Sequence, residues 1–275
     1  ENMIAGDFSS FDTCMAQQVT TGVAKIIVDL YQRAGCSKED LTLLEGCLSD
    51  ICNPNVLFMG DLYNFANLNP SGQPLTVQEN GMSNSVMMRY VFYALRKRFN
   101  ITDKRSFAEC IKLGTYGDDN AMGVKPTCTY YTHTLCQEEF ERIGIKYTMA
   151  QKDAVSRPYM PLSELSFLKR SFAWHDELET WVAPIEMEST IKKFHFVKKP
   201  NESPLNFCEQ FAAHLDSALR DSVLRGKDEY ESFVGKIRRI VDRNPDLRMH
   251  VILHTYKEML DLIRPNFTTT GLDYH

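Results

Sequence analysis

The chain has 275 residues and a formal net charge of −5; 43% of its residues are hydrophobic and 24% are charged. These values are typical of a soluble globular protein with one large domain or two smaller ones. The acidic balance argues against a protein that simply coats nucleic acid, and no apolar run is long enough to span a bilayer.

The eight cysteines include no Cys-x-x-Cys pair and no zinc-finger spacing, which predicts reduced, mostly buried thiols in a cytosolic protein. Cys128, His133 and Cys136 are close in sequence, but a metal site there would lack a fourth ligand. The first residue is Glu1, no secretory signal follows it, and we expect the chain to be a piece of a longer polypeptide.

The opening segment, MIAGDFSSFD, predicts a strand that ends at Asp7 and presents its carboxylate at the strand tip. Asp12 follows in the turn, close enough to share the same site. An alternative role for Asp12 is that of an N-cap for a helix that begins near Thr13, because Asp is common at that position.

Apolar periodicity then predicts several elements in order. These are a helix at 14–33, a second helix at 37–51, a hairpin with a Gly60–Asp61 turn, and a long helix at 75–99.

Thr76 and Asn80 share one face at the start of the long helix. Their side chains either contribute to a functional site or cap the N-terminus of the helix. Gly81 costs about 1 kcal/mol relative to Ala inside a helix, so we expect another segment to approach the backbone there.

The segment Tyr116-Gly117-Asp118-Asp119 lies between two short β-type runs and predicts a hairpin with two adjacent carboxylates at its tip. Gly and Asp are ordinary turn residues, so the alternative is a solvated loop. The case for chemistry depends on a second acidic site, which Asp7 and Asp12 supply.

The remaining sequence predicts a helix at 129–143, strands up to about residue 185, and then helices only. We expect those helices at 203–225, 228–243 and 247–263, and the change in composition near residue 185 predicts a domain boundary.

Five segments in a fixed order carry a resemblance to a known family: GDFSSFD, PSGQPLTVQEN, YGDD, GIKYTMAQKD and FLKR. The chain resembles the RNA-dependent RNA polymerases of picorna-like positive-strand RNA viruses, and these segments are similar to five palm motifs of that family. The second fits the pattern Ser-Gly-x3-Thr-x3-Asn. The resemblance implies an α+β right-hand polymerase fold, with an antiparallel palm at 1–184 and an α-helical thumb at 185–275.

The resemblance also implies the chemistry, which is addition of ribonucleotides to an RNA 3′-hydroxyl by a two-metal mechanism. Asp7 and Asp118 would be the principal ligands of two Mg²⁺ ions, for which Mn²⁺ can substitute. Asp119 would support them, and the backbone carbonyl of Phe8 is a further candidate ligand. Hard oxygen ligands of this kind suit Mg²⁺.

Three further groups of residues follow from the same resemblance. The ribose of the incoming nucleotide would lie near Asp12, Ser71, Gly72, Thr76 and Asn80. Lys152 would protonate the departing pyrophosphate as a general acid, with an exposed loop lysine as the alternative. Lys169 and Arg170 would contact the primer strand, with the solvent face of a strand as the alternative.

The family's fingers precede the first palm motif, and nothing in the chain corresponds to them. We therefore expect little or no polymerase activity from the chain alone. Expected partners are template and primer RNA, ribonucleoside triphosphates and other replication proteins of a parent polyprotein, in replication complexes of the host cytoplasm. Two alternatives stay open, which are a reverse transcriptase-like palm and a catalytically dead RNA-binding scaffold.

Overall fold

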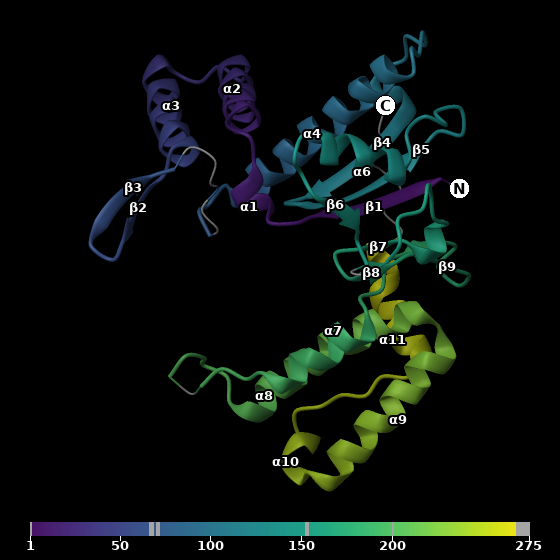
Figure 1. Cartoon of the computed structure of the whole chain (residues 1–275). Coiled ribbons are helices and arrows are strands. Elements are labelled where there is room, and N and C mark those ends of the chain that lie inside the picture. The colour runs from purple at the N-terminus through teal and green to yellow at the C-terminus, as the bar shows by residue number, and fades with distance from the viewer. Residues whose placement is uncertain (1, 66–68, 70–71, 152–153, 200, 268–275) are drawn as a thin grey trace. The chain divides into compact units, whose positions relative to one another are not determined.

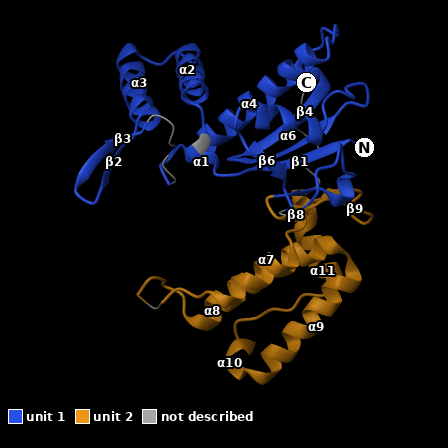
Figure 2. Cartoon of the chain, viewed as in Figure 1, with its two compact units in different colours: residues 1–167 blue, residues 168–275 orange. Residues whose placement is uncertain are grey.

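The computed structural model describes residues 2–65, 69, 72–151, 154–199 and 201–267 (Figure 1). The chain divides into two compact units, residues 1–167 and 168–275 (Figure 2). The division comes earlier in the chain than the boundary predicted between residues 184 and 185, and the assignment of the two parts as palm and thumb stays a prediction. In the described ranges, no helix has both the length and the apolar character needed to cross a membrane.

An antiparallel sheet with the strand order β4-β5-β1-β6 forms the centre of unit 1 (Figure 1). Its strands are β1 (Met3–Phe8), β4 (Ile111–Tyr116), β5 (Asp119–Val124) and β6 (Tyr147–Met149). The first strand of the chain is therefore central, and it pairs with two strands that follow much later in the sequence. This topology brings the N-terminal acidic segment beside the β4–β5 hairpin.

Helices α4 (Thr76–Arg98) and α6 (His133–Arg142) pack against one face of this sheet. The helices of unit 1 are α1 (Phe11–Cys14), α2 (Gln17–Arg33), α3 (Lys38–Cys52), α4 (Thr76–Arg98), α5 (Phe107–Cys110) and α6 (His133–Arg142), with a 3-10 turn at Leu162–Glu164. Buried side chains of α4, such as Met88 and Phe92, share one core with Ile4 of β1, Met122 of β5 and Phe140 of α6. The predicted α+β class is confirmed.

Three predicted boundaries in unit 1 were wrong. The helix predicted at 14–33 begins at Gln17, because Met15 and Ala16 are extended after the short helix α1, which ends at Cys14. The hairpin of β2 (Asn55–Phe58) and β3 (Asp61–Asn64) turns at Met59 and Gly60, whose positive φ angles of 52° and 94° suit a tight two-residue turn. The run before β4 begins as the short helix α5, which a capping box of Ser106 and Glu109 starts.

The remaining elements are short strands followed by helices. The strands are β7 (Ser166–Phe167), which ends unit 1, and β8 (Arg170–Ser171), β9 (Ala173–His175) and β10 (Thr180–Val182) of unit 2. The helices are α7 (Met187–Lys192), α8 (Phe207–Ser222), α9 (Lys227–Arg243), α10 (Pro245–Arg248) and α11 (Tyr256–Ile263), with 3-10 turns at Lys193–His195, Val223–Arg225 and Arg264–Asn266.

Unit 2 has a separate apolar core, which includes Leu219, Tyr230 and Met259. The single helix predicted at 247–263 was wrong, since the chain is not helical between α10 and α11. A capping box of Thr255 and Glu258 starts α11.

Candidate active site

The pairing of the strands brings the two acidic segments together. Gly6 of β1 is opposite Asn120 of β5, so the next residues along these antiparallel strands, Asp7 and Asp119, occupy neighbouring positions. Side chains alternate between the two faces of a strand, and Phe8 and Asn120 are buried on the core side. Asp7 and Asp119 therefore share the opposite face of the sheet.

Asp118 lies in the turn that joins β4 to β5. Tyr116 is paired with Asp119, which leaves Gly117 and Asp118 as a two-residue turn. Gly117 has a φ of 61°, in the left-handed region that favours glycine. The predicted hairpin is confirmed, and its tip places Asp118 beside the acids on the two strands.

The three carboxylates interact electrostatically. Burial raises the pKa of Asp119 above its ordinary value, and the negative charges of Asp118 and Asp7 raise it further. These effects agree with the strand pairing, which puts Asp7 and Asp118 near Asp119. A divalent cation at this site would offset the repulsion around Asp119.

The acids do not form a metal cage of their own. Among the residues that the structure describes, no group of three or more His, Cys, Asp or Glu side chains has the geometry to hold a metal ion. Mg²⁺ in nucleotide sites keeps several waters and is held by one or two carboxylates together with substrate phosphates. Asp7 and Asp118 fit this open type of site, in which the substrate supplies the missing oxygen ligands.

Close packing fixes the strand that carries Asp7. A Cβ atom added to Gly6 would lie 2.0 Å from both Cζ and Oη of Tyr147. The Tyr147 ring is buried against Phe8, with ring centroids 4.9 Å apart, and its hydroxyl donates to Oδ1 of Asn120 at 2.8 Å. The glycine before the acid therefore lets Tyr147 pack against β1 while it is hydrogen-bonded to β5.

Two of the residues predicted around the ribose, Asp12 and Asn80, meet in a polar network. The side-chain amide of Asn80 donates to Oδ1 of Asp12 at 3.0 Å. Its carbonyl oxygen accepts from Nδ2 of Asn69 at 2.6 Å, and the backbone N–H of Asn69 donates to the backbone carbonyl of Asp12 at 2.9 Å. The predicted proximity of Asp12 and Asn80 is confirmed, whereas the alternative of Asp12 as an N-cap was wrong, because Ser10 holds that position for α1.

Asn69 is a member of this network that the sequence did not identify. It is buried with 3% of its surface exposed, and it directs the amide of Asn80 by donating to its oxygen. Asn69 lies two residues before Ser71 of the predicted second motif. Asn is common in turns, so its type alone gave no signal.

The start of α4 supplies the remaining polar contacts. Gln73 donates to a carboxylate oxygen of Glu79 at 3.1 Å, and Thr76 donates its hydroxyl to the backbone carbonyl of Gln73 at 2.9 Å. Burial raises the pKa of Glu79. Gly72 has a φ of 89°, which explains a glycine at this point of the predicted motif.

Asn84 of α4 contacts the acidic turn directly, although the sequence did not single it out. Its side-chain Nδ2 lies 2.7 Å from the backbone oxygen of Asp118 and 3.3 Å from those of Gly117 and Asp119. Asn84 lies four residues after Asn80, and this spacing on one helical face was the signal that could have identified it.

The other predicted residues lie elsewhere. Ser71 and Lys152 fall outside the described residues. Lys169 is exposed in a turn of unit 2, with a φ of 58°. Arg170 donates to the backbone carbonyl of Ala183 at 2.7 Å and lies 3.5 Å from the carboxylate of Asp221. Arg170 therefore has structural contacts within unit 2, and its role in RNA binding stays a prediction.

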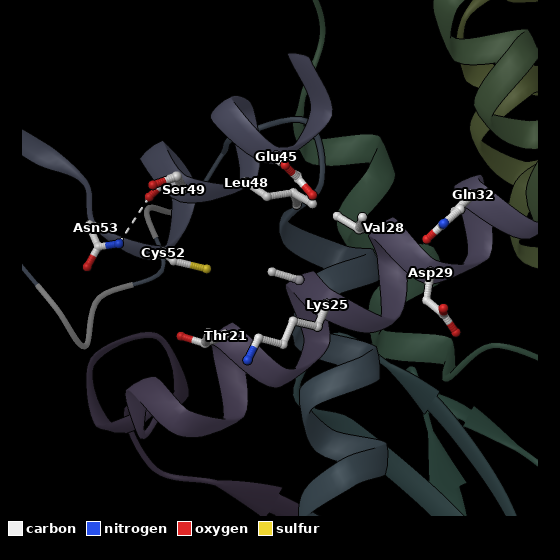
Figure 3. Close-up of a pocket in the computed structure, with 11 residues that line it drawn as sticks. Thr21, Lys25, Val28, Asp29, Gln32, Glu45, Leu48, Ser49, Cys52 and Asn53 are labelled. Carbon is white, nitrogen blue, oxygen red and sulfur yellow. Dashed lines mark hydrogen bonds between the residues drawn. The ribbon is translucent and has the colours of Figure 1, made fainter. Parts of the chain in front are cut away.

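A pocket of about 340 Å³ lies between α2 and α3 (Figure 3). Lys25, Asp29 and Glu45 are among the residues that line it, and Asp29 forms an ion pair with Arg33 at 2.7 Å. None of the predicted site residues in the described ranges lines it. The pocket is therefore separate from the acidic site.

The cysteines carry no metal site in the part of the chain that the structure describes. The described cysteines are all free, and Cys128, Cys136 and His133 are buried. Burial raises the pKa of Cys136 to about 12, which disfavours the thiolate that binds metals.

An antiparallel sheet with acids at adjoining strand ends, backed by helices, is the arrangement of a polymerase palm. Comparison with known proteins agrees. A family model described as viral RNA-dependent RNA polymerase matches residues 1–243. The chain therefore belongs to the viral RNA-dependent RNA polymerase family.

Individual viral proteins illustrate the match. The replicase polyprotein of Drosophila C virus (strain EB) is 24% identical over 94% of this chain, and the RNA1 polyprotein of Andean potato mottle virus is 30% identical over 83%. The solved structure of the Sicinivirus 3Dpol RNA-dependent RNA polymerase covers 98% of this chain with a TM-score of 0.70 and 15% identity, which supports the fold. The chain spans 15%, 31% and 52% of these three proteins.

Proposed function

We propose that this chain is the catalytic part of an RNA-directed RNA polymerase, a nucleotidyltransferase that replicates viral RNA. The observation that carries the proposal is the position of Asp7 and Asp119 on paired strands, next to Asp118 in the turn that joins β4 to β5. Burial raises the pKa of Asp119, and the charges of Asp118 and Asp7 raise it further. Family membership supports RNA as template and product and ribonucleoside triphosphates as substrates. The match to polyproteins supports an origin by processing of a larger precursor.

Asp7 and Asp118 would hold two Mg²⁺ ions, or Mn²⁺ in their place, with Asp119 in support and the Phe8 carbonyl as a further ligand. When bound, the ions would activate the attacking 3′-hydroxyl and stabilise charge on the leaving phosphate. The residues of the chain orient these ligands. β1 carries Asp7, and the β4–β5 turn carries Asp118.

Asp12 and Asn80 would recognise the ribose 2′-hydroxyl, which both donates and accepts hydrogen bonds. An acceptor and a donor are both present, since the Asp12 carboxylate can accept a hydrogen bond and the Asn80 amide can donate one. Ser71, Gly72 and Thr76 would arrange the loop that leads to them. Lys152 would protonate the pyrophosphate, and Lys169 and Arg170 would contact the primer; these further roles rest on the family resemblance.

The other two functions have less support. A reverse transcriptase would favour deoxyribonucleotides, whereas the family match and the Asp12–Asn80 pair favour ribonucleotides. A catalytically dead scaffold would not need three clustered acids. We further propose that the chain needs fingers for activity, and that it works in replication complexes of the host cytoplasm with other products of its polyprotein.

Primer extension on an RNA template tests the proposal, with the chain joined to the fingers of its parent polymerase. Asp118→Asn should lower the rate by about a thousandfold, because loss of several kcal/mol of transition-state stabilisation is expected when a metal ligand is removed. Asp61→Asn, which changes an exposed carboxylate of the β2–β3 hairpin, is the matched control and should keep its activity. Equal activity of the two variants would refute the proposed metal site.

A further inference from the structure

The backbone of the acidic turn is held by a side chain from a different element. Asn84 is fully buried in α4, with none of its surface exposed. Its Nδ2 lies within 3.3 Å of three consecutive backbone oxygens, those of Gly117, Asp118 and Asp119, and the shortest distance, 2.7 Å, is to Asp118. An amide group has two hydrogens, so it can satisfy two of these acceptors fully and share with the third.

The direction of the Asn84 amide is fixed by these contacts. Turning it by 180° would place its oxygen against three carbonyl oxygens, which repel it. The oxygen of Asn84 has no hydrogen-bond partner among the described residues. A buried acceptor without a partner costs free energy, so the donor half of the amide must contribute enough to offset this cost.

A second contact joins the same helix to the hairpin. The hydroxyl of Thr115 donates to the backbone carbonyl of Gly81 at 3.1 Å. A Cβ at Gly81 would lie 3.4 Å from that hydroxyl oxygen and 3.7 Å from the backbone nitrogen of Gly117. The expected close approach at Gly81 is therefore confirmed, and the approaching segment is the strand that leads into the acidic turn.

Asn80 and Asn84 are four residues apart on α4, so they lie on one face of the helix. Asn80 contacts Asp12 in the predicted ribose network, and Asn84 contacts the turn of Asp118. One rigid helical face thus connects the group that would recognise the sugar with the groups that would hold the metal.

We infer that Asn84 is a positioning residue of the active site, which fixes the backbone from Gly117 to Asp119 and so the directions of the Asp118 and Asp119 carboxylates. The inference rests on the proposed function, because it assumes that these carboxylates bind divalent cations. Loss of an outer hydrogen-bond partner of a metal ligand typically weakens metal affinity by about 10- to 100-fold.

The test uses the 275-residue chain and two substitutions of Asn84. Asn84→Leu has the same branched shape and no donor, and Asn84→Ala serves if the larger Leu side chain prevents folding. Ser83→Ala is the matched control, because Ser83 is the preceding residue of α4, is also buried, and has a hydroxyl without a partner among the described residues.

The first readout is the ¹³C resonance of the backbone carbonyls in the turn, measured by NMR. The resonances of Gly117, Asp118 and Asp119 should shift in Asn84→Leu and stay in place in Ser83→Ala. The second readout is Mn²⁺ affinity in the presence of a ribonucleoside triphosphate, measured from the paramagnetic broadening of the Asp7 and Asp118 signals. Asn84→Leu should bind Mn²⁺ about tenfold more weakly than the unmodified chain, or more weakly still.

The outcomes separate the inference from the proposed function. If the unmodified chain binds Mn²⁺ and Asn84→Leu binds it equally well, Asn84 does not position the ligands and the inference is overturned. Unchanged carbonyl resonances in Asn84→Leu would overturn it as well. If the unmodified chain shows no Mn²⁺ broadening near Asp7 or Asp118, the proposed metal site itself is contradicted.

Discussion

Replacement of Gly6 by Ala should destabilise unit 1 and displace the strand that carries Asp7. The added Cβ would lie 2.0 Å from two atoms of Tyr147 and 2.4 Å from a third, far inside van der Waals contact. Tyr147 has little room to move, because 1% of its surface is exposed, its ring stacks on His133 and its hydroxyl bonds Asn120.

The expected cost follows from this crowding. Adding a methyl group to a well-packed core typically costs about 1–3 kcal/mol, and the fixed position of Tyr147 favours the upper end. For a unit of this size, each kcal/mol lowers the melting temperature by about 2–4 °C. Gly6→Ala should therefore lower the melting temperature by roughly 5–10 °C.

Thermal unfolding followed by circular dichroism measures this effect. Gly114→Ala is the control, because it adds the same methyl group to the same sheet, where the nearest atom, the carbonyl oxygen of Ala121, is 3.9 Å away. In a double-mutant cycle, prior replacement of Tyr147 by Ala should remove most of the destabilisation that Gly6→Ala causes. Equal melting temperatures for Gly6→Ala and Gly114→Ala would refute the packing argument.

Three other changes test separate parts of the structure. Glu79→Gln should raise the free energy of unfolding at neutral pH and not at pH 4. Burial raises the folded-state pKa of Glu79 above 4.5, so the folded state loses stability as the pH rises from 4.5 through the folded-state pKa. Denaturant titrations at several pH values measure this, with exposed Glu141→Gln as control, and parallel curves for the two variants would contradict it. Asn69→Ala should lower the preference of the parent polymerase for ribonucleotides about fivefold in kcat/KM, the equivalent of one hydrogen bond of about 1 kcal/mol; unchanged selectivity would show that Asn69 does not direct Asn80. Thr255→Ala should cost about 1 kcal/mol of unit 2 stability through loss of the α11 cap, and an unchanged denaturation midpoint would contradict it.

The sequence was sufficient to predict the elements that build the site. The β1 strand, the hairpin around Gly117 and Asp118 and the long helix α4 all have strong local signals, namely apolar periodicity and turn residues. The contact between Asp12 and Asn80 came from the family resemblance, since nothing in the spacing alone relates two residues so far apart.

Errors occurred where a short polar signal outweighed apolar periodicity. Ser106, Asn206 and Thr255 each precede a Glu by three residues. Ser106 starts a helix where none was predicted, and Asn206 and Thr255 start helices later than predicted. These capping boxes are visible in the sequence.

The contacts of Asn69 and Asn84 could not be predicted, although the spacing of Asn84 from Asn80 placed both on one helical face. Their contacts join segments that are distant in sequence, and an Asn residue in a loop or helix does not reveal its partner. The clash at Gly6 is similar, because it depends on the position of Tyr147 in a strand that joins the sheet much later in the chain.

The anomalous scattering of Mn²⁺ in crystals of this chain soaked with Mn²⁺ and a ribonucleoside triphosphate tests the central claim most directly. If Asp7 and Asp118 share a metal site, anomalous density should lie within bonding distance of carboxylate oxygens of both residues. Density confined to other acidic residues, or side chains of Asp7 and Asp118 directed to different ions with no shared site, would contradict it.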